Sequence, residues 1–141
     1  METATIYNKA RYEQNLIFKG TESKGNMHLS DIDGCMDIQG KYFITVEVKT
    51  GSTKLPLGQK ITLTTMTDAL QRGGYKKAII IVARHNTDVR EDIHLKDCYI
   101  SEFYMDGKWK RVNFDISYNE FIGRFAYQNK IERLKDLWVM N

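Results

Sequence analysis

The chain has 141 residues with a formal net charge of +3, and 42% of its residues are hydrophobic. This length and composition predict one globular domain over residues 1–141 and exclude a disordered protein. The small basic bias is compatible with a polyanionic partner, but it is common in proteins that never bind nucleic acid. The two cysteines form no C-x-x-C motif, which excludes a disulfide framework and a structural zinc site.

No segment of the sequence predicts a membrane span or secretion. The longest apolar run, AIIIVA at residues 78–83, is far shorter than the roughly 18 residues that cross a bilayer. The N-terminal residues lack the apolar stretch of a signal peptide. We therefore expect a cytoplasmic protein without a membrane partner.

The first half of the chain predicts a helix followed by a β-hairpin. Apolar residues recur at helical spacing over residues 5–18, and the glycine-containing segment at 19–26 ends this pattern. Two segments of strand character then flank a turn at residues 39–41, and a loop at 50–59 follows.

The second half continues with helices and strands. A helix is predicted over residues 58–74, ending at two glycines, and a strand that is apolar on both faces over 76–85. A hairpin follows within residues 97–114, and an amphipathic helix capped by Ser117 covers 117–138. The predicted order is αββαβ, then a hairpin and a helix.

The first hairpin brings charged side chains together on one face. A three-residue turn places Ile38 opposite Tyr42, and the same register places Asp33 opposite Glu47. Lys49 lies on the same face as Glu47 because side chains alternate along a strand. The opposite face of the hairpin is apolar and predicts a core contact.

Two adjacent carboxylates repel each other unless one takes up a proton or a cation lies between them. A hard divalent ion, Mg²⁺ or Mn²⁺, fits Asp33 and Glu47, with the backbone carbonyl of Val48 as a further ligand. Lys49 beside such an ion would orient or deprotonate a water molecule, which is the chemistry of phosphodiester hydrolysis. The alternative is an edge hairpin whose charged face is merely solvated.

The segments SDIDG and ITVEVK, between a first helix and a GQ…DAL helix followed by an AIIIVA strand, resemble the PD-(D/E)xK nuclease superfamily. The resemblance covers about residues 5–85 and leaves a hairpin and a C-terminal helix at about 97–138. It implies an α/β (α+β) fold with a restriction-endonuclease-like αβββαβ core, in which helices flank a mixed central sheet.

The resemblance also implies roles for individual residues. Asp33 matches the motif aspartate, Glu47 the second acid and Lys49 the lysine. Glu13 matches the glutamate that many members carry in the first helix, and Gln59 matches the glutamine that opens the following helix. The ordinary interpretation of the last two is a surface helix residue and a helix start.

The sequence departs from the superfamily pattern in several places. No proline precedes the aspartate, and Asp31 competes with Asp33 for its role. The first strand, expected around residues 25–30, is weakly marked. Leu63 stands where one branch of the superfamily has tyrosine, so the branch is not assigned.

The predicted function is Mg²⁺-dependent hydrolysis of DNA by a small nuclease of the kind that phages encode, acting in the host cytoplasm. Two alternatives stay open: a non-catalytic DNA-binding domain with the same fold, and a protein-interaction or inhibitor module. The aromatic residues of the last helix fit either a core or a homodimer contact. The basic residues expected to contact DNA phosphates are Lys54, Lys60, Lys76, Lys77 and Arg84.

Overall fold

A computed structural model of the protein describes residues 13–25 and 27–134. The chain divides into two units, Met1–Asp31 and Ile32–Asn141. Each unit is described by itself below.

In the N-terminal unit, the described end of the predicted first helix is not helical. Residues 13–18 form a turn and irregular chain, and the rest of the predicted helix, 5–12, lies outside the described residues. Leu16 and Ile17 are 81% and 70% exposed. The extension of the helix to residue 18 was therefore wrong, because a short helix needs a buried apolar face to be stable.

The first strand expected at residues 25–30 is also not formed by the described residues of that segment. One isolated β-bridge joins Ser23 and Met27, and the apolar side chains of Met27 and Leu29 are exposed. Without a buried face, nothing fixes the register of a strand. The described residues therefore do not show the first strand of the expected αβββαβ order.

In the second unit, the described residues form one mixed five-stranded sheet in the order β1-β2-β3-β4-β5. The central pair, β2 and β3, is parallel, and the other neighbours pair antiparallel. This confirms the predicted α/β class with a mixed sheet. The strands are β1 (Gly34–Ile38), β2 (Tyr42–Thr50), β3 (Lys77–His85), β4 (Tyr99–Met105) and β5 (Lys108–Arg111), and the helices are α2 (Leu57–Arg72), η1 (Leu95–Asp97), α3 (Tyr118–Asn129) and η2 (Glu132–Leu134).

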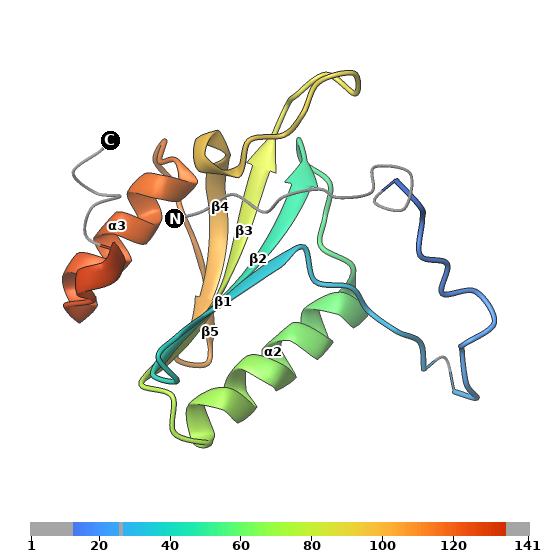
Figure 1. Cartoon of the computed structure of the whole chain (residues 1–141), viewed down its shortest axis with the longest axis horizontal. Coiled ribbons are helices and arrows are strands. Elements are labelled where there is room, and N and C mark those ends of the chain that lie inside the picture. The colour runs from blue at the N-terminus through green and yellow to red at the C-terminus, as the bar shows by residue number, and fades with distance from the viewer. Residues whose placement is uncertain (1–12, 26, 135–141) are drawn as a thin grey trace. The chain divides into compact units, whose positions relative to one another are not determined.

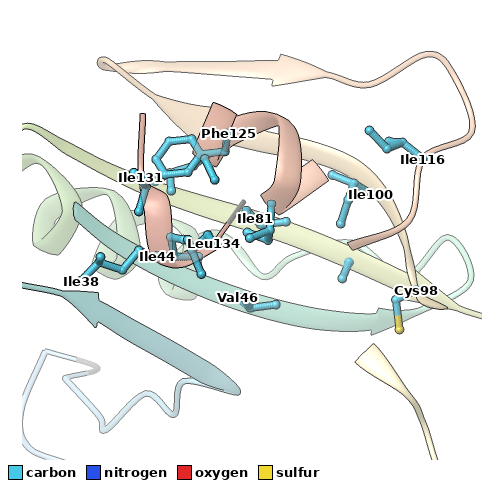
Figure 2. Packing of buried hydrophobic residues seen from close by; sticks show 14 residues of the cluster. Ile38, Ile44, Val46, Ile81, Cys98, Ile100, Ile116, Phe125, Ile131 and Leu134 are labelled. Atoms are coloured by element: carbon cyan, nitrogen blue, oxygen red, sulfur yellow. The ribbon is translucent and has the colours of Figure 1, made fainter. Parts of the chain in front are cut away.

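A helix covers each face of the sheet, α2 on one and α3 on the other (Figure 1). Ile81 of β3 packs in a large apolar cluster with Ile44 and with Phe125 of α3 (Figure 2). Its neighbour Ile80 points the other way, into a smaller cluster with Leu63 of α2. This double cover explains why β3 is apolar on both faces.

The crossover helix α2 joins the two parallel strands and ends where the sequence predicts. Arg72 is its last residue, and Gly74 then adopts a positive φ of 122° that few other residues tolerate. The helix forms despite its threonines. The hydroxyls of Thr62 and Thr64 donate to the carbonyls of Gly58 and Lys60 one turn earlier, which satisfies them inside the helix.

The last helix begins as predicted but ends early. The Ser117 hydroxyl accepts a hydrogen bond from the Glu120 N–H at 3.1 Å, which confirms the predicted cap. At the other end, Lys130 takes the left-handed conformation and the Ile131 N–H donates to the Ala126 carbonyl at 2.8 Å. The predicted extension to residue 138 was wrong within the described residues, because burial of Ile131 in the core turns the chain away from the helix axis.

The helices of the described residues are all too short or too polar to cross a bilayer.

Candidate functional site

The β1–β2 hairpin sets the position of the predicted site. Ile38 pairs with Tyr42, as the three-residue turn predicts, and the pairing continues to Gly34 opposite Val46. The turn is possible because Gln39 and Gly40 both adopt positive φ. The predicted register is confirmed, and it leads directly to Asp33 and Glu47 at the open end of the hairpin.

Asp33 is held against β2 by a backbone hydrogen bond. Its Oδ2 accepts from the Val48 N–H at 2.7 Å, a short distance typical of a charged acceptor. This contact fixes the Asp33 carboxylate beside Glu47, because Glu47 directly precedes Val48 in β2. Val48, predicted as a metal ligand through its carbonyl, therefore has an observed role through its N–H.

Glu47 is buried, with 1% of its surface exposed, on the face of the sheet that α2 covers. Its Oε2 accepts a hydrogen bond from Nε2 of Gln59 at 2.9 Å. Its Oε1 has no hydrogen-bond partner among the described residues. A solvated surface glutamate, the alternative interpretation of the sequence, is excluded, since a buried carboxyl oxygen without a partner is costly.

The environment raises the pKa of Glu47 from 4.5 to about 7. Burial is the main cause, because a charged carboxylate loses its hydration, and the neighbouring Asp33 carboxylate adds repulsion. The positive charge of Lys49 acts in the opposite direction. The three predicted residues of the motif therefore interact electrostatically within one cluster.

Gln59 lies next to Glu47 in the structure. It lies in the first turn of α2, and its side-chain amide reaches across to the Glu47 carboxyl. This contact ties the start of the helix to the end of β2. Gln59 is therefore a residue of the helix start that also contacts Glu47, and its role in catalysis stays a prediction.

Arg84 stands next to Lys49, because these residues are directly paired between the parallel strands β2 and β3. Its Nη1 donates to the carbonyls of Gly51 and Thr53, and its Nε donates to the Ser101 hydroxyl at 2.8 Å. These bonds fix the loop that follows β2. Arg84 was predicted to contact phosphates, and the sequence did not indicate this structural role.

The remaining predicted residues are distributed over the molecule. Glu13 and Asp31 are exposed residues of the N-terminal unit, and their roles stay predictions. Lys77 begins β3, seven residues before Arg84, which is about 23 Å along an extended strand. It forms an ion pair with Asp106 at 2.7 Å. The structure therefore does not bring Lys77, or its neighbour Lys76, to the carboxylate pair.

The carboxylate oxygens of Asp33 and Glu47 fit an ion such as Mg²⁺, for which the protein would supply only part of the ligands. In the described part of the chain, no three His, Cys, Asp or Glu side chains lie close enough together to hold a metal ion. Asp33 and Glu47 thus act as a pair. Mg²⁺ is commonly bound through one or two carboxylates, with water and substrate phosphates completing the shell. Oε1 of Glu47 has no hydrogen-bond partner among the described residues, so a cation bound there would not compete with a hydrogen bond from them.

Comparison of the chain with protein-family models, with curated proteins and with solved structures found no match in any of the three.

Proposed function

We propose that the protein is a Mg²⁺-dependent nuclease that hydrolyses DNA phosphodiester bonds, with a restriction-endonuclease-like core. The observation that carries the proposal is the buried Glu47 carboxyl beside Asp33, with Lys49 on the same strand face. One oxygen of this carboxyl has no hydrogen-bond partner in the described part of the chain. Buried carboxylates are normally paired with a cation of the protein, whereas Glu47 is buried next to a second carboxylate, that of the exposed Asp33.

In this proposal, Asp33 and Glu47 hold the ion through their carboxylates, with the Val48 carbonyl as a further ligand. Bound there, Mg²⁺ supplies charge stabilisation for the phosphate and a lower pKa for the attacking water. Gln59 holds the Glu47 side chain in place through its amide. The Val48 N–H does the same for Asp33.

Lys49 orients the attacking water and stabilises the negative charge that builds up on the phosphate oxygens. Hydrolysis adds the water oxygen to phosphorus, breaks one phosphorus–oxygen bond and transfers a proton to the leaving oxygen. Arg84, one strand away, keeps the following loop in a fixed position through its carbonyl contacts. It therefore supports the site without touching the reacting atoms.

The test is cleavage of labelled single-stranded and double-stranded DNA with 5 to 10 mM Mg²⁺ or Mn²⁺, concentrations of the order that a weak oxygen-ligand site needs. Asp33→Asn and Lys49→Ala are each expected to lower the cleavage rate by about 100-fold or more, because the first removes a proposed ligand of the ion and the second removes the group that orients the water. The matched controls are Asp92→Asn and Lys96→Ala, which change exposed residues outside the cluster and should cut like wild type.

Two outcomes would reject the nuclease. If wild type and both site variants cut equally, a contaminant is responsible. If none of the proteins cuts either DNA with either metal, the activity is absent, and a non-catalytic DNA-binding domain becomes the better description.

A further inference from the structure

A cleft of about 1020 Å³ lies in the second unit, and its lining begins at Gly51, directly after the end of β2. One wall is the loop after β2 and the start of α2, including Lys54 and Lys60. The other wall is Arg111, the last residue of β5, and the chain that follows it, residues 112–115. Arg84 lines the cleft and pairs with Lys49 across neighbouring strands, which are about 4.8 Å apart. The cleft therefore begins one strand away from the proposed catalytic lysine.

Two irregularities of the sheet shape this cleft. The pairing of β3 and β4 shifts between Val82 and Ala83, so that Ser101 is an extra residue in β4 and its hydroxyl accepts from Arg84. Bulges of this kind redirect side chains and occur preferentially at sheet edges and near active sites.

The second irregularity lies at the edge of the sheet. The Val112 N–H donates to the Ser101 carbonyl, and the next contact along β4 is from the Ile100 N–H to the Ile116 carbonyl. Residues 113–115 therefore loop out of the edge pairing, and all three are exposed. The extruded loop forms part of the cleft lining.

The charge of the lining favours a polyanion. Lys54, Lys60 and Arg111 contribute three positive charges. Of the two acids in the lining, Glu102 lies 3.9 Å from the guanidinium of Arg84, which offsets its charge, and Asp115 is the other. Basic side chains along a groove are the usual means of following a phosphate backbone.

The extruded loop also presents an aromatic ring. Phe114 is 58% exposed although it is a large apolar side chain. The guanidinium of Arg124, from α3, lies 5.5 Å from the centre of its ring, a cation–π contact that favours an ordered ring. An exposed ring in a basic groove can stack on an unpaired base, whereas the bases of a duplex are already stacked on each other.

We infer that the cleft binds an unpaired DNA strand, with Phe114 stacking on a base and Lys54, Lys60 and Arg111 contacting phosphates. The inference rests on the proposed function in one respect, which is that the bound DNA strand is cleaved next to Lys49. It specifies the substrate: single-stranded DNA, or a single-stranded end or branch of a duplex, is preferred over intact duplex.

The test separates binding from cleavage. Binding of the full chain to a labelled 12-nucleotide strand and to the same sequence as a blunt duplex is measured by fluorescence anisotropy in EDTA, where no hydrolysis occurs. The single strand is expected to bind at least tenfold more tightly. Phe114→Ala should weaken binding of the single strand by about 5- to 100-fold, as expected for loss of one stacked base, and leave the duplex unchanged.

The control variants test whether the effect depends on the aromatic ring of Phe114 and on its place in the cleft. Phe114→Tyr retains a stacking ring and should bind like wild type. Tyr127→Ala removes an aromatic residue of α3 that is 70% exposed and lies outside the lining, so it should have no effect. Lys54→Ala should lower the slope of log affinity against log salt by about 0.7, while Lys96→Ala should not.

Equal binding of both DNAs by wild type, or equal binding of the single strand by wild type and Phe114→Ala, would overturn the inference and leave the proposed nuclease standing. Single-strand binding that depends on Phe114, in a protein that cuts no DNA with Mg²⁺ or Mn²⁺, would instead reject the nuclease and support the cleft.

Discussion

The two faces of the sheet bury different kinds of side chain. The face covered by α3 packs apolar side chains, among them Ile44, Ile81 and Phe125, in one large cluster. The face covered by α2 has a smaller apolar cluster and also buries Thr45 and Glu47, each with an oxygen that lacks a partner among the described residues. One face therefore supplies most of the stability, while the other contains a polar site that lowers it.

The largest expected effect is on the α3 face. Ile81→Ala removes a fully buried side chain from the large cluster and should lower the free energy of unfolding by about 3 to 5 kcal/mol. Ile80→Ala, on the α2 face, should lower it by about 2 to 3 kcal/mol, because fewer buried neighbours are lost. Denaturant unfolding measures both, with Val89→Ala, which is fully exposed, as the control near zero. A larger loss for Ile80→Ala than for Ile81→Ala would contradict the comparison.

The next effect is a pH dependence that belongs to the α2 face. The pKa of Glu47 is about 7 in the folded protein and 4.5 ordinarily, so the folded state holds this proton more tightly. In EDTA, the contribution of Glu47 to the free energy of unfolding is complete below pH 4.5. It is lost as the pH rises through 7, by up to about 3 kcal/mol.

Glu47→Gln carries no titrating group at this position and tests that dependence. The melting temperature of wild type should fall relative to that of Glu47→Gln as the pH rises from 5 to 8. This range runs from just above the ordinary pKa of 4.5 to just above the folded-state pKa of about 7. A constant difference between the two proteins over this range would show that Glu47 titrates normally and is not held in an apolar, anionic environment.

The smallest effect concerns a charge pair away from both faces. Lys77 and Asp106 form an ion pair at 2.7 Å with side chains 31% and 47% exposed. Lys77→Ala should lower the free energy of unfolding by less than about 1 kcal/mol, because solvent screens the pair. It should leave cleavage unchanged, since it lies at the far end of β3. A strong loss of cleavage would place Lys77 in the DNA interface, as the sequence alone predicted.

The parts of the fold that the sequence predicts well are those with local signals. The turn at Gly40, the alternation of β2 and the apolar run of β3 together fix the register that pairs Gly34 with Val46, next to Asp33 and Glu47. The two helix limits that were wrong depend on tertiary burial. Residues 13–18 have no buried face, and Ile131 ends α3 by entering the core.

For the site, too, the sequence predicts what depends on local spacing and misses what depends on tertiary contacts. The sequence indicates the pair of acids, Lys49 and Gln59, because all four belong to short segments with defined spacing. It does not indicate the bonds of Arg84 to the loop after β2, nor the cleft formed by the extruded residues 113–115, because both depend on contacts between strands distant in the sequence. Phe114 carried no sequence signal beyond being an aromatic residue near a hairpin.

We propose above that Asp33 and Glu47 together form a divalent-cation site. The most direct measurement is a titration with Mn²⁺ at pH 8, where Glu47 has lost its proton, followed through the melting temperature. We predict a saturable rise for wild type, because a ligand that prefers the folded state stabilises it, and no rise for Asp33→Asn or Glu47→Gln. A flat titration for wild type, or an equal rise in all three proteins, would contradict the account.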